Sequence, residues 1–435
     1  MTVETKMALT EQDVRSYSAK MNEADWMADF RADALAKAEQ LPMPKPDKTK
    51  IDKWNFTEFP VHTVESATYS SLDELSEEAR ALVDKDQQNS IYVQHNNTPA
   101  YLFLSEELKA KGVIMTDIFT ASREHSDLMK KYFMTDGVKV DEHKLTALHA
   151  ALINGGVFVY VPKNVVVEEP IQVLFLHDDE QASLFNHVLV VAEANSSVTY
   201  VENYLSTVEE AKGLANIVSE VFTGDNAQIT YGAVDVLAKG FTTYVNRRGV
   251  TGRDSRIDWA LGLMNDSDTI SENITHLVGN GSHCDMKTVV VGRGQQRQNF
   301  TTEIVHWGTD TEGFILKHGV VKEASTCIFN GIGRIAKGAT RANAVQESRV
   351  LMLSERARGD ANPILLIDED DVTAGHAASV GRVDPMQLFY LMSRGISQHE
   401  AERLVIHGFL APVVSKLPIE GVKKQLTEVI ERKVR

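Results

Sequence analysis

The sequence contains very little cysteine: its 435 residues include only Cys284 and Cys327. Two cysteines cannot build the disulfide framework of a small secreted domain, and no C-x-x-C pair is present to begin a zinc site. A metal centre held by several thiolates would therefore need sulfur ligands from another chain.

Long apolar runs and an excess of basic charge are also missing. No segment approaches the roughly 18 apolar residues that span a bilayer, and the stretch MTVETKMALTEQDV lacks the basic and apolar parts of a secretion signal. The 61 acidic residues outnumber the 45 basic ones, for a net charge of -16, which argues against binding to nucleic acid or anionic lipid. We therefore predict a cytoplasmic protein with no nucleic-acid partner and no membrane partner.

Common catalytic motifs are absent or stand in the wrong context. No G-x-x-x-x-G-K-[ST] loop is present to cradle phosphates, and no G-x-S-x-G elbow is present to expose a nucleophilic serine. Gly331, Gly333 and Ala336 match a G-x-G-x-x-A fingerprint, but β-type residues flank them and Gly338 stands where a helix should run. We interpret these glycines as turn residues and expect neither dinucleotide binding nor ATP hydrolysis.

The first 150 residues show mostly helical patterns, and we predict a helical or mixed region over 1–150. The segment LPMPKPDKTK (41–50) interrupts these patterns, because its three prolines remove backbone donors and favour an extended, exposed connector. A later helical pattern ends at the glycine pair 155–156, and the period then changes from helical to alternating.

Short β-type runs fill the middle of the chain, among them VFVYV, IQVLFL and HVLVVA, and no helix-length pattern separates them. Three segments that start at 221, 249 and 276 align without gaps. They place Gly224, Gly252 and Gly279 in one column, at spacings of 252 − 224 = 28 and 279 − 252 = 27. Two looser copies occur at 190–200 and 320–329.

Each copy leads from a turn into a strand with two buried-type residues two positions apart, which share one face of the strand. These pairs are Val198 and Tyr200, Ile229 and Tyr231, Ile257 and Trp259, Cys284 and Met286, and Cys327 and Phe329. Such repeats bury a face only when they stack, so we favour a β-solenoid over a β-sandwich, which needs no columnar repeat. We predict a mainly β fold with a right-handed parallel β-helix over residues 151–383.

The C-terminal segment is predicted to be helical. Asp384 and Pro385 supply an N-cap and an N1 proline, while Ser397 and Glu400 form a capping box for a second helix that should end before Pro412. A third helix is amphipathic; its apolar stripe is Ile419, Val422, Leu426, Val429 and Ile430. We expect these apolar stripes to cap the open end of the solenoid.

Two groups of residues in the predicted β-helix could serve a chemical function: the histidines near Cys284, and several acidic residues. Cys284 lies near His276 and His283, but the repeat places it in a core slot, so we interpret it as a small buried hydrophobe and not as a metal ligand. Acidic pairs leave open an alternative function, a cytosolic β-helix glycan hydrolase or lyase. The candidate acids are Asp254, Asp258, Asp285 and Glu303.

His376 stands alone among small residues in DVTAGHAASVG (371–381). Either its ring fills space at a strand end and bonds a backbone carbonyl, or the small neighbours leave it accessible as a neutral imidazole that can bind a metal. The local residues do not decide between these two interpretations.

Three longer motifs resemble the SufB/SufD family of the SUF iron–sulfur cluster assembly system. They are DDVTAGHAASVGRVDPMQLFYLMSRGIS (370–397), DKWNFTEF (52–59) and NGGVFVYVPKNVVVEEPI (154–171). The resemblance extends over the whole chain and is closest to the SufD members. It implies a β-helix flanked by helical regions, a heterodimer with SufB through the β-helices, and SufC, an ATPase, docked on the C-terminal helices of residues 384–435.

The resemblance further implies a subunit that is not an enzyme. It would help iron acquisition and cluster assembly at the interface with SufB, and it would bind no cofactor stably on its own but share a transient iron–sulfur cluster. His376 falls on a SufD histidine that works there with a SufB cysteine, which makes it a candidate ligand. Exposed strand edges would permit a homodimer of the isolated chain, but the sequence does not determine whether one forms.

The chain departs from some relatives in ways that leave it poor in thiols. Ala374 and Gly375 stand where a Cys-Ser pair can occur, and Leu391 stands where a cysteine can occur, which is similar to SufD and unlike the thiolate-bearing SufB. The candidate SufC contacts are Leu388, Phe389, Tyr390 and Arg394. For the last two, four residues apart, a simple helix-surface pair is the alternative.

Overall fold

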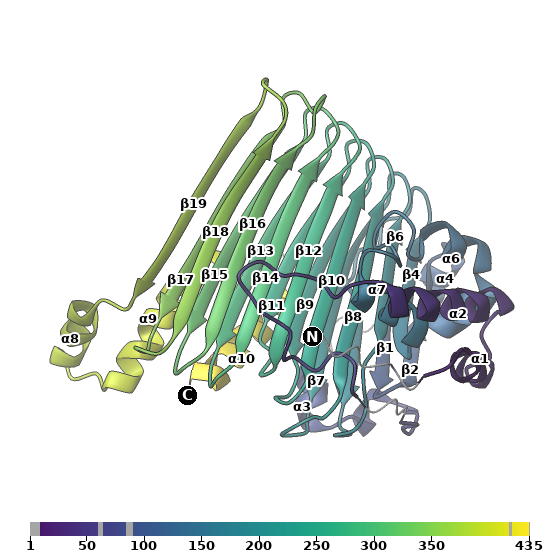
Figure 1. Ribbon diagram of the computed structural model, residues 1–435, viewed down its shortest axis with the longest axis horizontal. Helices are drawn as coiled ribbons and strands as arrows, with labels where there is room; N and C mark the ends of the chain where they lie inside the picture. Colours follow the sequence, from purple (N-terminus) through teal and green to yellow (C-terminus); the bar gives the residue numbers. More distant parts are fainter. Residues whose placement is uncertain (1–8, 60–63, 84–89, 417–419, 435) are drawn as a thin grey trace.

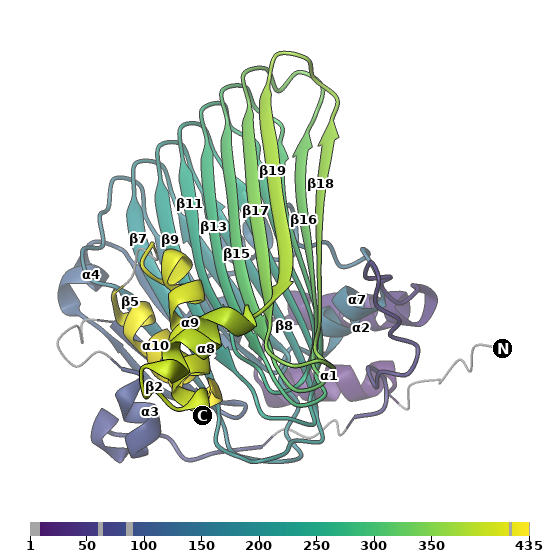
Figure 2. The same cartoon turned by 90° about the vertical axis from the view of Figure 1, so that its left-hand side faces the viewer.

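The structure is a computed structural model that describes residues 9–59, 64–83, 90–416 and 420–434. Its body is a solenoid in which strands β4 to β19 alternate between two facing sheets, so that each coil adds one strand to each sheet (Figures 1 and 2). Strands that neighbour each other within these sheets of the solenoid are parallel. The predicted mainly β fold with a parallel β-helix is therefore confirmed.

The two sheets of the solenoid face each other along its whole length, with the core between them. In the ten-stranded sheet the solenoid strands are β5 (Ile171–His177), β7 (Ser197–Ser206), β9 (Gln228–Val236), β11 (Arg256–Leu263), β13 (His283–Gly292), β15 (Glu312–Val321), β17 (Asn343–Met352) and β19 (Thr373–Arg382). In the nine-stranded sheet they are β4 (Gly155–Val161), β6 (Asn186–Ala192), β8 (Leu214–Thr223), β10 (Thr242–Thr251), β12 (Asp268–Leu277), β14 (Arg297–His306), β16 (Thr326–Ile335) and β18 (Arg358–Ile367).

The interior columns that the repeat predicts are present in β7, β9, β11 and β13. Parallel pairing aligns one column of Val198, Ile229, Ile257 and Cys284 and a second column of Tyr200, Tyr231, Trp259 and Met286, all buried between the sheets. The fifth pair, Cys327 and Phe329, is buried in the same core but lies on β16, in the opposite sheet. Its expected place in the column is wrong, because the turns at both ends of a coil use similar Gly-, Asn- and Ser-rich sequences.

The glycine column marks the closest approach between successive coils. A Cβ added to Gly279 would overlap the backbone of Gly252 and Arg253, and one added to Gly252 would lie 2.7 Å from the carbonyl carbon of Gly224. Glycine is required at these turns because backbone packs directly on backbone.

The N-terminal part contains helices and also three strands, whose positions the sequence analysis did not locate within the helical or mixed region predicted there. β1 (Ser90–His95) and β2 (Thr98–Leu104) form an antiparallel pair that extends the ten-stranded sheet, and β3 (Ile114–Asp117) extends the nine-stranded sheet. The helices are α1 (Glu11–Lys20), α2 (Asp25–Gln40), the short 3₁₀ helix η1 (Leu72–Glu74), α3 (Glu77–Ala81), α4 (Glu106–Ala110), α5 (Ile118–Glu124), α6 (Ser126–Tyr132) and α7 (Lys144–Leu152).

Several of these helices pack on the outer face of the nine-stranded sheet, where residues from α2, α5 and α7 share one apolar cluster with outward residues of β4, β6 and β8. The proline-rich segment after α2 crosses the same face as a strap (Figure 1). Asn299 on β14 donates to the backbone oxygen of Asp47 (2.7 Å), and Lys48 reaches Asn362 on β18. The expected connector is thus extended but bound to the sheet.

The C-terminal helices are α8 (Pro385–Ser393), α9 (Gln398–Val414) and α10 (Glu420–Val434). The apolar stripes of α9 and α10 pack on the outer face of the ten-stranded sheet, with Leu426 seated 2.5 Å from where a Cβ of Gly262 would lie. The expected cap on the solenoid end is therefore wrong, because outward Val and Ala residues of this sheet form one apolar cluster with the two helices.

Two details of these helices also differ from the sequence prediction. Pro412 lies inside α9, which continues to Val414, because a proline in the last turn disturbs little of the helix that precedes it. Ile419 lies outside the described residues. Within the residues that are described, no helix is long and apolar enough to cross a membrane.

Candidate functional site

His376 lies on β19, the last strand of the ten-stranded sheet. β19 pairs with β17 so that His376 stands beside Gln346, which continues the interior column through Ile315, Met286 and Trp259. The ring therefore belongs to the inner face of the last coil. It is nevertheless exposed, because no further coil follows to cover it.

Small neighbours leave space around this ring. Ala374 and Ala378, the residues two positions away on the same face of β19, carry only methyl side chains. Within the described part of the chain, the imidazole of His376 has no hydrogen bond or ion pair. Both ring nitrogens are thus available to a group that approaches from outside.

The end of the solenoid around His376 is open. β18 and β19 are the terminal strands of their sheets, and Figure 2 shows their outer edges uncovered along most of their length. Leu366, Ile367 and Val380 expose apolar side chains at this end. Unpaired strand edges with apolar residues are suited to pairing with another chain.

The two thiols cannot reach this end. Cys284 and Cys327 are fully buried in the core, and burial raises the pKa of both, which keeps them protonated. His283 faces Glu312 (3.1 Å) and His276 stacks on Trp307, so neither joins Cys284. The interpretation of Cys284 as a core residue is confirmed, and among the described residues no group of three or more His, Cys, Asp or Glu side chains could hold a metal ion.

The candidate acids of the alternative hydrolase each lie near a basic residue. Asp258 pairs with Arg256 (2.6 Å), Asp285 with Lys287, and Glu303 with Arg334 (2.9 Å), while Asp254 lies in a turn 3.7 Å from Arg253. Each of these carboxylates is thus engaged by a neighbouring cation.

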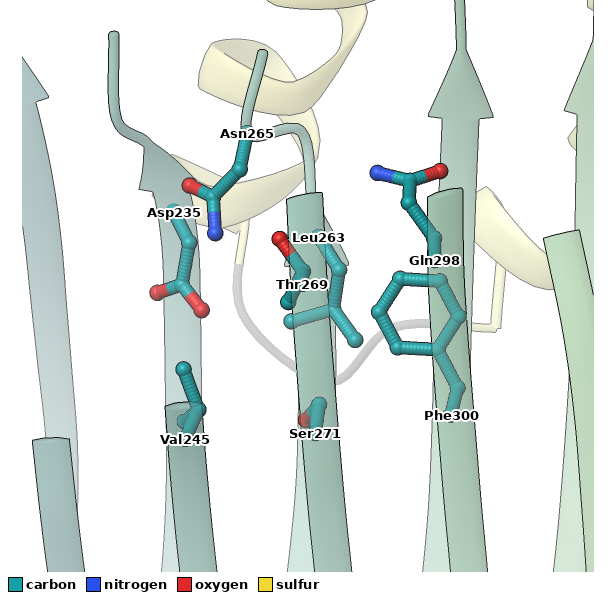
Figure 3. A pocket seen from close by; sticks show the side chains of 8 residues that line it. All are labelled: Asp235, Val245, Leu263, Asn265, Thr269, Ser271, Gln298 and Phe300. Carbon is teal, nitrogen blue, oxygen red and sulfur yellow. The ribbon is translucent and has the colours of Figure 1, made fainter. Parts of the chain in front are cut away.

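The interior of the solenoid is polar in its middle coils. Arg247 contacts Asp235 (2.9 Å) and Glu202 (3.2 Å), all without solvent exposure, and burial raises the pKa of both carboxyl groups. Figure 3 shows Asp235 with Asn265 and Gln298 around one inner pocket. This pocket leaves no room for even a water molecule, so it is a packed polar core and not a ligand site.

The predicted partner residues lie on α8 and, for Arg394, at its C-cap. Phe389 is 64% exposed and Tyr390 58% exposed, and Leu388 is half-buried. Arg394 donates to the Tyr390 hydroxyl (3.0 Å), with its guanidinium 5.0 Å from the ring centre, so the expected helix-surface pair exists. The structure does not bring these residues together with His376; they form a separate exposed face.

Two interior polar residues near the open end were missed from the sequence. Gln346 occupies the column slot of Ile315 and Met286, and His306 lies on the inner face of β14. The signal that could have found Gln346 is a polar residue in a column that is otherwise apolar or aromatic.

Comparison with known proteins covers nearly the whole chain. The family described as "SUF system FeS cluster assembly, SufBD core domain" matches residues 175–409, and "SufBD protein N-terminal region" matches residues 14–173. The chain is 66% identical over 437 aligned positions to "Iron-sulfur cluster assembly protein SufD" of Bacillus subtilis (strain 168), with 100% of both chains covered.

More distant relatives are SufBD family proteins of two staphylococci. The protein of Staphylococcus haemolyticus is 31% identical and that of Staphylococcus saprophyticus 30% identical, each with 96% of this chain and 91% of the relative covered. Together with the solenoid and its exposed terminal histidine, these matches identify the family. The chain belongs to the SufBD family of the SUF iron–sulfur cluster assembly system.

Proposed function

We propose that this chain is a non-catalytic subunit of a SUF scaffold complex in the cytoplasm. It pairs with a SufB subunit through the open end of the solenoid and helps iron acquisition and cluster assembly there, with His376 as one ligand of the nascent cluster. The observation that carries the proposal is an exposed, unpartnered imidazole at a free solenoid end, in a chain whose thiols are buried.

The ligand chemistry supports a shared site. Iron–sulfur clusters are held by thiolates, with histidine as an occasional replacement. This chain offers the exposed His376 on β19 and no accessible thiol, so a cysteine of the SufB subunit would supply a thiolate. The cluster is then a transient cargo of the complex, and this chain alone binds none stably.

The free edges of β18 and β19 offer a way for this chain to pair with a SufB subunit. The backbone groups of β18 and β19 lack a neighbour on one side, and a second solenoid could add its own edge strands to them. In the absence of SufB, two copies of this chain could pair in the same way, which predicts a homodimer of the isolated protein.

The exposed face of α8 would bind the SufC ATPase. Phe389, Tyr390 and Arg394 present two aromatic rings and a guanidinium, which are residue types enriched in protein interfaces, and Leu388 adds an aliphatic side chain. On this proposal residues 1–150, 151–383 and 384–435 serve as N-terminal region, scaffold core and ATPase-docking region.

The test of the histidine uses the chain co-expressed with its SufB and SufC partners. His376→Ala is expected to leave the purified complex intact and to abolish cluster formation on anaerobic reconstitution, measured by absorption and by iron and sulfide content. His399→Ala, which removes an exposed histidine of α9, is the matched control and should assemble clusters normally. A His376→Ala complex with the full cluster content would refute the ligand role.

A further inference from the structure

Helix α8 is apolar but contributes no buried side chain to the molecule. Its nine residues, PMQLFYLMS, include Met386, Phe389 and Met392, and none of the nine is buried. Figure 1 shows the helix projecting beyond the last coil of the solenoid. An apolar helix without a buried face is expected to be covered by a partner.

Both exposed methionines of the described chain lie on this helix. Met386 is 67% exposed and Met392 is 43% exposed, whereas the other described methionines are buried or half-buried. Each stands three residues from Phe389, one before it and one after it, so both are its neighbours on the helix surface. The most accessible thioethers of the described residues therefore belong to the face that Phe389 and Tyr390 form.

Docking of a partner on this face would bury the two methionines beside the aromatic rings. A methionine side chain is apolar and flexible, and its sulfur makes favourable contacts with aromatic rings. Removal of one such side chain from water is worth about a factor of ten in affinity. Both side chains therefore favour docking as long as they remain thioethers.

Hydrogen peroxide converts an exposed thioether into a sulfoxide. The sulfur lone pair attacks one peroxide oxygen, an S=O bond forms, and the O–O bond breaks. After proton transfer the second oxygen leaves as water, so the methionine loses two electrons and the peroxide gains two. The sulfoxide is polar, and it disrupts interfaces that methionine helps to form.

We propose that Met386 and Met392 form a peroxide-sensitive modification site, and that their oxidation weakens docking of the ATPase on α8. This regulation rests on the proposed function, in which α8 binds SufC. It acts on the undocked chain, whose methionines are accessible, and it uncouples the ATPase from the scaffold while peroxide is present. Methionine sulfoxide reductases reverse it, because the two enzyme classes together reduce both sulfoxide epimers.

The test treats the purified full-length chain with hydrogen peroxide, removes the peroxide with catalase, and then measures SufC binding by isothermal titration calorimetry. Peptide mass spectrometry of the same samples locates the sulfoxides. We expect Met386 and Met392 to oxidise before the buried Met264 and Met286, and docking to become at least tenfold weaker. Treatment with both reductases should restore it.

A double variant, Met386→Leu with Met392→Leu, keeps two apolar side chains that peroxide does not oxidise. Each protein is compared with its own untreated sample, so any effect of leucine on docking is removed from the comparison. Peroxide should change docking of the double variant less than twofold. Met43→Leu, which replaces a half-buried methionine of the strap, is the control and should lose docking as the wild type does.

Docking that survives full conversion of both methionines to sulfoxides, or an equal loss of docking in the double variant, would overturn the proposal. Absence of sulfoxide at Met386 and Met392 after treatment would overturn it as well. Failure of the untreated wild-type chain to bind SufC would refute the proposed role of α8, and with it this regulation, before any peroxide is added.

Discussion

The glycine column makes a quantitative prediction about how the coils are spaced. Gly279→Ala adds one methyl group to the turn between β12 and β13, where it would overlap the backbone of Gly252 and Arg253. Because no flexible side chain can move aside, the two coils must separate locally. The hydrogen bond from Gly279 N to Thr251 O (3.0 Å) spans this contact and would be strained.

The expected cost follows from these contacts. Overpacking of a tight site costs about 1–3 kcal/mol, and loss of one hydrogen bond adds about 1 kcal/mol, so we expect the free energy of unfolding to fall by about 2–4 kcal/mol. Urea unfolding followed by circular dichroism measures this change. Gly381→Ala on β19 is the matched control, since its Cβ would meet no atom within 4 Å. Equal unfolding midpoints for Gly279→Ala and the wild type would refute the close-packed turn.

Three further predictions concern the core and its charges. Leu426→Ala removes the side chain that seats α10 on the ten-stranded sheet and is expected to lower stability by about 2–5 kcal/mol, measured as a lower thermal midpoint; an unchanged midpoint would contradict this docking. Arg247→Met leaves two buried carboxyl groups without their cation and should cost about 3–5 kcal/mol in urea unfolding, whereas wild-type stability would show that this ion cluster contributes nothing. Burial raises the pKa of Glu220 to about 8, above its value in the unfolded chain, so between about pH 5 and 8 the folded state retains a proton that the unfolded state has lost. The contribution of Glu220 to stability should therefore fall as the pH rises through this window, and Glu220→Gln, which cannot ionise, should show a flatter profile; identical slopes for the two proteins would refute the assignment.

The repeat in the sequence predicts the solenoid because each column has one physical requirement. Residues such as Ile257 and Trp259 face the core, and Gly252 and Gly279 meet the backbone of the neighbouring coil. The number of residues in one coil therefore equals the interval at which these residue types recur in the sequence. The repeat placed Cys327 in the wrong sheet, half a coil away from its position on β16, which shows what the repeat cannot predict. Turn residues identify a turn but not which end of the coil it closes.

The surfaces that the helices cover could not be predicted in the same way. An apolar stripe such as that of α10 specifies that a partner surface exists, whereas its location depends on which outward positions of the sheets are apolar. The strands β1 and β2 were missed for a related reason: they are short and flanked by helical patterns, and only their pairing with β5 makes them part of the sheet.

The candidate site likewise has features that the sequence predicts and features that depend on the folded structure. A lone His376 among small residues indicates an accessible ring, but its place on the inner face of the last coil follows from its pairing with Gln346 across β17 and β19. The side-chain orientations of His306 and Gln346 depend on hydrogen bonds to Thr311 and Ile364, which only the folded chain brings together.

The central claim is that His376 itself ligates the nascent cluster at the open end of the solenoid. The most direct measurement is electron–nuclear double resonance on the reduced, cluster-loaded complex in which only this chain carries ¹⁵N-histidine. The account predicts a ¹⁵N coupling that disappears in His376→Gln. A spectrum without nitrogen coupling, or a coupling that survives this substitution, would contradict it.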